Sequence, residues 1–87
     1  MYYAGWNEVG TLTKHNRKGK LRDTFRVFQN QLGWCKGRRD QTGKELWFNS
    51  EEELQTKLDS LLHLNYKVAS EINIPNEITS RFSVAAD

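Results

Sequence analysis

The chain has one cysteine, two histidines and no long apolar run, and each scarcity removes a class of protein. A lone Cys35 cannot form an intramolecular disulfide, so we expect a reducing compartment and a cytoplasmic location. His15, His63 and Cys35 lack the paired spacing of metal ligands. No stretch approaches the roughly 18 apolar residues of a membrane-spanning helix, and the first ten residues show no signal-peptide pattern. We therefore expect a soluble protein without metal, cofactor or membrane contact.

Motifs for catalysis are also missing. The sequence contains no glycine-rich phosphate loop, no G-x-S-x-G elbow and no paired metal-ligand set. Cys35 lies in "WCKGRR", where the basic neighbours would lower the pKa of its thiol, but no general base lies nearby in the sequence. We interpret it as a small buried residue. The carboxylates of residues 51–53 would point about 100° apart on a helix and cannot face one substrate. We expect no enzyme.

What the chain does contain is enough apolar surface for one folded domain. Hydrophobic residues make up 37% of its 87 residues, with three Trp, three Tyr and four Phe. A chain of this length buries only about 60–65% of its unfolded surface, so we expect a single domain over residues 1–87 with one thin core. Residues 1–6 form an aromatic N-terminal segment, and residues 83–87 are expected to be mobile.

The clearest helix signal begins at Ser50. Ser50 and Glu53 have the spacing of a capping box, with the serine hydroxyl suited to the amide of Glu53 and the glutamate suited to reach back. Leucines at four helically spaced positions then make one apolar stripe, and Asn65 suits a left-handed helix end. The pattern predicts a helix over about residues 51–64.

Two segments ahead of this helix predict strands. Residues 7–14 are rich in β-branched side chains, which favours an edge-type strand. Residues 20–29 fit a strand, but their apolar residues also fit a helical stripe. We favour the strand because the segment has no N-cap residue and mediocre helix formers inside it.

After the helix, residues 66–74 predict a returning strand that Pro75 ends, because proline lacks the amide that a central strand needs. Residues 76–87 predict a short edge strand or a loosely docked tail. Residues 16–19 and 40–43 each place Asn or Asp first and Gly last, which is typical of a type I turn closed by a glycine bulge. The predicted fold class is α+β: a small two-layer domain with an antiparallel meander of three to five strands and one amphipathic helix on one face.

Charge is distributed unevenly. Residues 1–47 hold ten Lys and Arg against four Asp and Glu, and residues 48–87 hold three against seven. Basic residues flank both predicted turns: Lys14, Arg17, Lys18, Lys20 and Arg22 at the first, and Arg38, Arg39 and Lys44 at the second. Such tips are suited to a nucleic-acid backbone, and they also keep edge strands soluble.

The stretch "WCKGRRDQTGKELWFNSEEEL", residues 34–54, combines a basic Gly-Arg hairpin, an aromatic strand and an acidic-capped helix. In this order it is loosely similar to the WGR family of DNA-associated domains. The resemblance covers about a quarter to a third of the chain and departs at Lys36-Gly37-Arg38, which stands in place of the Trp-Gly-Arg signature. No residue role is carried across from that family.

Aromatic residues near the N-terminus point to protein recognition. Trp, Tyr and Arg dominate interface hot spots, and this chain has more Trp and Tyr than one thin core must bury. The interface candidates are Tyr2, Tyr3, Trp6 and Trp34. From this we expect a non-catalytic binding protein that acts as an inhibitor or adaptor, of the kind that phage-like mobile elements encode, on a partner that could present an acidic surface. The alternative is a nucleic-acid-binding module that uses the basic tips.

Overall fold

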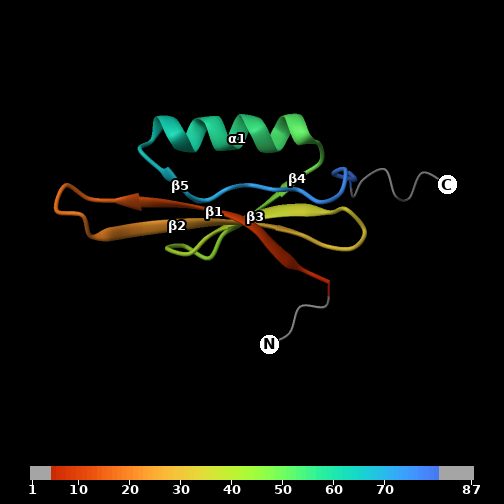
Figure 1. The fold of residues 1–87 in the computed structure, drawn as a ribbon, viewed down its shortest axis with the longest axis horizontal. Coiled ribbons are helices and arrows are strands. Elements are labelled where there is room, and N and C mark those ends of the chain that lie inside the picture. Colours follow the sequence, from red (N-terminus) through yellow and green to blue (C-terminus); the bar gives the residue numbers. More distant parts are fainter. Residues whose placement is uncertain (1–4, 81–87) are drawn as a thin grey trace.

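The computed structural model describes residues 5–80 as a five-stranded antiparallel sheet with one helix (Figure 1). The elements are β1 (Asn7–His15), β2 (Leu21–Gln29), β3 (Cys35–Arg39), β4 (Glu45–Phe48), α1 (Glu51–His63) and β5 (Lys67–Ser70). The strand order is β4-β3-β2-β1-β5. The α+β two-layer prediction is confirmed, with α1 lying along one face of the sheet.

The first four strands form a meander joined by three tight turns, and the first and third of these lie at the predicted positions. Gly19 closes the first turn with φ +82° and donates its amide to the carbonyl of Asn16. Gly43 closes the third with φ +73° and donates to the carbonyl of Arg39. Both glycines occupy the left-handed region, and both predicted hairpins are present. The first turn has the predicted bond from Gly19 to Asn16, whereas the third is one residue longer than predicted, because its closing bond runs to Arg39 and not to Asp40.

The segment that the sequence left open between strand and helix is a strand. β2 pairs with β1 on one side and with β3 on the other, and the register places Phe25 opposite Leu12 and Val27 opposite Gly37. Phe25 and Val27 are almost fully buried. A Cβ on Gly37 would lie 2.2 Å from the Phe25 ring, so the glycine makes room for that ring.

The helix begins and ends as its sequence signals predict. The Ser50 side chain accepts the Glu53 amide at 3.2 Å, and the Glu53 carboxylate accepts the amide of Asn49, one residue earlier than a standard capping box. At the other end Asn65 has φ +72° and donates to the carbonyl of Leu62, while the amide of Tyr66 donates to that of Leu61. These two bonds form a Schellman motif.

Two strand predictions need correction. β1 was expected at an edge, but it pairs with both β2 and β5, and the edges are β4 and β5. Residues 66–74 were expected to be a single strand, but β5 ends at Ser70. Residues 71–80 instead cross the helix side of the sheet without strand structure, held by side-chain bonds between Gln29 and the backbone of Asn76. The docked tail, not the edge strand, is therefore what forms over 76–80.

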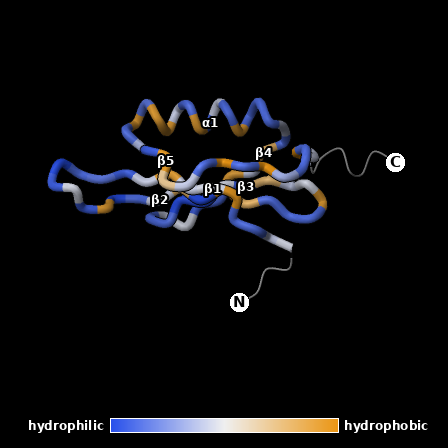
Figure 2. The backbone as a smooth tube through the Cα atoms, viewed as in Figure 1, coloured by the Kyte–Doolittle hydropathy of each residue, from blue (hydrophilic) through white to orange (hydrophobic). Residues whose placement is uncertain are grey.

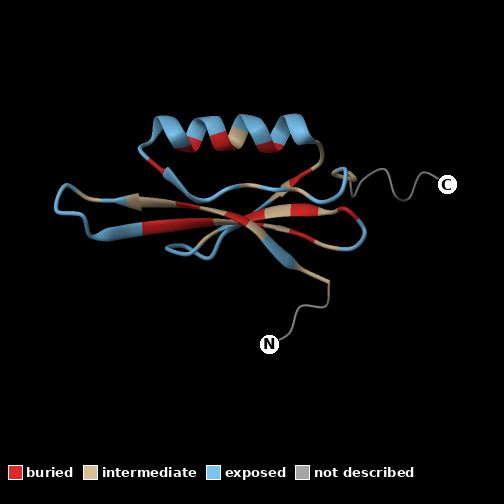
Figure 3. Cartoon of the chain, in the orientation of Figure 1, coloured by how far each residue is buried: buried red, intermediate tan, exposed pale blue. Residues whose placement is uncertain are grey.

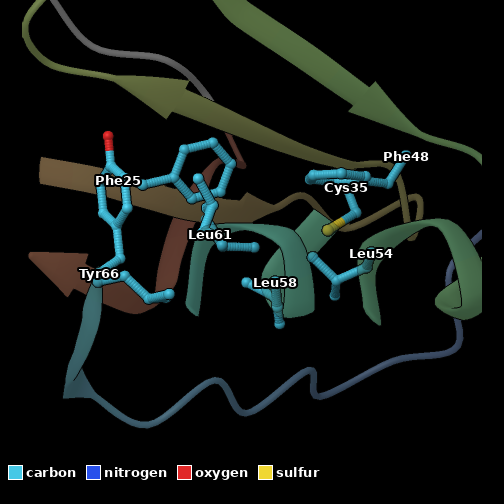
Figure 4. Packing of buried hydrophobic residues seen from close by; sticks show 9 residues of the cluster. Phe25, Cys35, Phe48, Leu54, Leu58, Leu61 and Tyr66 are labelled. Carbon is cyan, nitrogen blue, oxygen red and sulfur yellow. The ribbon is translucent and has the colours of Figure 1, made fainter. Parts of the chain in front are cut away.

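The core lies between α1 and the central strands. Buried positions gather on the inner side of α1 and along β2 (Figure 3). In the close view, Leu61 lies beside Phe25 and Tyr66, and Cys35 lies beside Phe48 and Leu54 (Figure 4). The opposite face of the sheet has no helix against it among residues 5–80 (Figure 1). We call this the open face.

Candidate interaction surfaces

Strand alternation determines which side chains reach the open face. Phe25, Val27 and Cys35 face the core, so their even-numbered neighbours face away from it. The register then brings one row of side chains into line across the sheet. That row consists of Glu8, Phe28, Lys36 and Trp47.

Trp6 and Trp34 each contact Trp47 of this row, and we call these three residues the tryptophan cluster. The ring centres of Trp6 and Trp47 are 5.6 Å apart, and those of Trp34 and Trp47 are 6.2 Å apart, with both pairs in an edge-on arrangement. The Lys36 ammonium lies 4.4 Å from the ring centre of Trp6, within cation–π range. All three tryptophans are only partly buried. The cluster therefore combines fixed aromatic rings with partial solvent exposure.

The structure brings two predicted interface residues together and adds one that the sequence reasoning missed. Trp6 and Trp34 each contact Trp47, which was not among the candidates. Its signal was present in the alternation of β4, where Phe48 faces the core and Trp47 must face outward. Tyr2 and Tyr3 lie outside the described residues.

Charges on the open face are balanced. Arg26 forms ion pairs with Glu8 and Asp40 at 3.3 and 3.0 Å. A hydrogen bond from Arg26 to Asp40, opposed by partial burial, raises the pKa of Arg26 above its usual value. Lys36 pairs with Glu45 at 3.0 Å. Exposed Arg38 is the remaining cation near the cluster. Such a surface has no strong attraction for a phosphate backbone.

The predicted basic tips lie together at one end of the molecule, which we call the basic end. The turn between β1 and β2 projects beyond α1 and β5 and is strongly hydrophilic (Figures 1 and 2). We call residues 14–22 the arm. The third turn lies against the base of the arm, since the amide of Asp40 donates to the carbonyl of Thr24 at 2.8 Å. The basic end carries Lys14, Arg17, Lys18, Lys20, Arg22, Arg39 and Lys44, whereas Arg38 lies on the open face.

A buried carboxylate joins the two turns. The Asp23 side chain is 2% exposed and accepts hydrogen bonds from Arg39 Nε at 2.9 Å and from the Gln41 amide at 3.1 Å. It also accepts from the Thr24 amide and from the Tyr66 hydroxyl. Burial alone would raise the pKa of Asp23, but these hydrogen bonds outweigh it and hold the pKa below its usual value. Burial and the Asp23 charge raise the pKa of Tyr66.

Beside this network is a cavity of about 220 Å³. Its lining includes Lys14, Arg22 and Arg39, which bring three cations to one hollow at the base of the arm. Asp23 and Tyr66 form part of its wall. Because Arg39 pairs with Asp23, these two charges offset each other, which leaves Lys14 and Arg22 as the lining cations that form no ion pair among the described residues.

The remaining candidates for chemistry are poorly placed for it. Cys35 is fully buried in the core, and burial raises the pKa of its thiol to about 12, so it stays protonated at neutral pH. The His63 ring bonds the carbonyl of Asp59 within α1, and His15 is exposed on the arm. Within residues 5–80, no group of three potential ligands is placed to hold a metal ion. Over the same residues, the helix is too short and too polar to cross a membrane.

A larger cavity, of about 620 Å³, is a wide-open groove between β4 and α1. Leu46 and Phe48 line one wall, and Thr56 and Ser60 line the other. Glu52, Glu53 and Lys57 also line the groove.

Comparisons with protein-family models, with curated proteins and with solved structures found no match to this chain. The resemblance of residues 34–54 to WGR domains thus gains no support from a family model. Any function must be argued from the surfaces themselves.

Proposed function

We propose that the protein is a small non-catalytic binding protein, an inhibitor or adaptor, that contacts a protein partner through the open face of its sheet. The observation that carries this proposal is the tryptophan cluster on a face that no helix covers within residues 5–80. Trp, Tyr and Arg are the residue types that most often dominate binding energy at protein interfaces. The partner surface would be apolar at its centre.

The charges around the cluster favour a protein over a polyanion. The ion pairs of Arg26 and Lys36 leave the open face close to neutral, so long-range attraction to a polyanion is weak there. Arg38 offers one exposed cation beside the cluster, suited to a carboxylate at the rim of a partner. The cluster is also preorganised, because its rings rest on a paired sheet and lose little freedom on binding.

One donor in the cluster has no acceptor among the residues that the structure describes. Trp34 Nε1 is buried and has no hydrogen-bond acceptor within residues 5–80. A buried donor without an acceptor costs about 1–3 kcal/mol. A bound state in which the partner supplies an oxygen after a small ring movement would remove that cost.

The test compares variants of the open face with a matched variant elsewhere. Trp6→Ala removes one ring of the cluster, and Leu62→Ala removes an exposed apolar side chain of α1 on the far side of the molecule. A partner isolated by affinity capture and then purified would be titrated with each protein. We expect Trp6→Ala to weaken binding at least tenfold and Leu62→Ala to leave it within twofold.

A second variant separates the surface from the stability of the fold. Arg38→Glu reverses an exposed charge next to the cluster without removing buried atoms, and we expect it to weaken binding severalfold while unfolding stays cooperative, with only a small loss of stability because the new carboxylate faces Glu45 on β4. A partner that binds wild type, Trp6→Ala and Arg38→Glu with equal affinity would show that the open face is not the interface.

A further inference from the structure

We propose that the basic end is a second, separate surface that binds the phosphate backbone of double-stranded nucleic acid. The arm would lie in a groove, and one phosphate would sit at the cavity at its base. This inference is independent of the protein contact on the open face, because the residues involved are different.

The arm has the shape for this role. It is a two-stranded β-ribbon, and the major groove of a duplex, about 12 Å wide, accepts such a ribbon. Its turn is rigid, because the Asn16 side chain accepts the amides of Lys18 and Lys20, both at 2.9 Å. The backbone of Asn16 bonds Lys20 and Gly19 as well. The backbone that carries the basic side chains of the turn is therefore already ordered, which reduces the conformational entropy lost on binding.

The charges on the arm are available for phosphate. Arg17, Lys18, Lys20 and Arg22 are exposed and form no ion pair within residues 5–80. Two carboxylates near the base of the arm already have partners: buried Asp23 is bonded by Arg39, and Asp40, which lines a hollow with Arg22, pairs with Arg26. Residues 14–22 contain no acid, so the arm projects nearly uncompensated positive charge.

The cavity at the arm's base supplies a defined position for one phosphate. Lys14, Arg22 and Arg39 line it, and its 220 Å³ lies below the roughly 300 Å³ of a pocket for drug-sized ligands. That volume suits a phosphate group better than a whole nucleotide. The Asp23 network fixes Arg39 there by tying the third turn to β2.

Absence of a stacking surface at this end favours a duplex over a single strand. Proteins that bind single strands stack bases on exposed aromatic rings. Within residues 14–22 there is no aromatic side chain, and Tyr66 beside the cavity is buried. The tryptophan cluster lies on the open face, away from the arm. The cations of the arm would thus supply the phosphate contacts, and stacking on unpaired bases would not contribute.

The experiment is a fluorescence-anisotropy titration of a labelled 20-base-pair DNA duplex with the whole protein at about 50 and 200 mM NaCl. With about four phosphate contacts, each contributing a slope near −0.9, affinity should fall roughly 100-fold between these salt concentrations. A single strand of the same length should bind more weakly than the duplex. No binding to the duplex at 50 mM NaCl, or tighter binding to the single strand, overturns the proposal.

Two matched variants locate the contact. Lys18→Ala and Lys57→Ala each remove one lysine charge, the first from the arm and the second from α1. We expect Lys18→Ala to weaken duplex binding severalfold and to reduce the salt slope by about one, and Lys57→Ala to change neither. Equal losses from both variants would mean that only net charge matters and would refute the arm as the contact.

A third variant distinguishes this inference from the proposed function. Trp6→Ala should leave duplex binding unchanged, because Trp6 lies on the open face. Loss of duplex binding in Trp6→Ala, with Lys18→Ala unaffected, would place the nucleic acid on the open face and overturn the proposal.

Discussion

Asp23 is an acidic side chain on the apolar side of β2, and four donors keep it charged there. The alternation of β2 already places Asp23 on the same face as Phe25 and Val27, so the sequence contains a signal for a buried charge. The hydrogen-bond partners of Asp23 could not be predicted from the alternation of β2. Arg39 and Tyr66 lie 16 and 43 residues away, and only the pairing of β2 with β3 and the end of α1 bring them together.

We predict that this carboxylate makes stability dependent on pH. The pKa of Asp23 is lower in the folded protein than its unfolded value, about 3.9, so the unfolded state binds the proton more readily. The stabilisation is complete above that value and is lost as the pH falls through the folded pKa. Asp23→Asn should destabilise the protein by about 1–3 kcal/mol at pH 7, and the difference from wild type should shrink by pH 3.

Urea unfolding of both proteins at pH 7, 5 and 3 measures this difference. Tyr66→Phe provides the comparison, because it removes a single donor to Asp23 and keeps the ring in the core. A penalty for Asp23→Asn that is the same at pH 3 and pH 7 would contradict an ionised Asp23 in the folded state.

At the scale of elements, the helix is the part that local signals specify best. The N-terminal bond from the Glu53 amide to Ser50 and the left-handed Asn65 both occur at the predicted residues. Ser50→Ala should therefore destabilise the protein by about 1 kcal/mol, and Ser50→Asp, which can still accept the amide, should cost much less. Urea unfolding of the three proteins at pH 7 tests this, and equal stability of Ser50→Ala and wild type would exclude a role for the cap.

The strands were harder to predict because their partners decide them. Residues 20–29 satisfy both a strand and a helix pattern, and pairing on both sides with β1 and β3 selects the strand. Residues 7–14 read as an edge because nothing local indicates a second neighbour. That second neighbour is β5, which follows α1 in the sequence and begins more than fifty residues after β1 ends. Residues 71–74 continue the alternation of a strand but keep only one backbone bond to β1, from the Asn73 amide to the Val9 carbonyl, so pattern alone overestimates β5.

For the molecule as a whole, the two candidate surfaces differ in how far they could be predicted from the sequence. Basic residues at both turns were visible in the sequence, and alternate turns of a meander must emerge at the same end of the sheet. The basic end could thus be assembled from topology alone. The tryptophan cluster could not, because Trp6, Trp34 and Trp47 come from three separate parts of the chain and meet only once the register is known.

Stability of the whole should depend on the segment after the helix. A chain cut after Asn65 would lose Tyr66 from the core, leave Asp23 without its hydroxyl donor and expose the edge of β1. We expect residues 1–65 to show no cooperative urea transition by circular dichroism, and residues 1–80, which retain all six elements, to show one. Cooperative unfolding of the shorter chain would mean that β1 to α1 form a stable unit without β5.

The strand order also has a consequence for synthesis on the ribosome. Of the six described elements β1 is made first, yet one of its two neighbours, β5, is made last. At about 5–20 residues per second, several seconds separate the two strands, and during that interval the nascent chain carries an unpaired β1 edge open to other chains. The positions that later pair with β5 are Thr11, Leu12 and Thr13, and the two polar threonines on either side of Leu12 make this edge a poorer template for aggregation until β5 has been made.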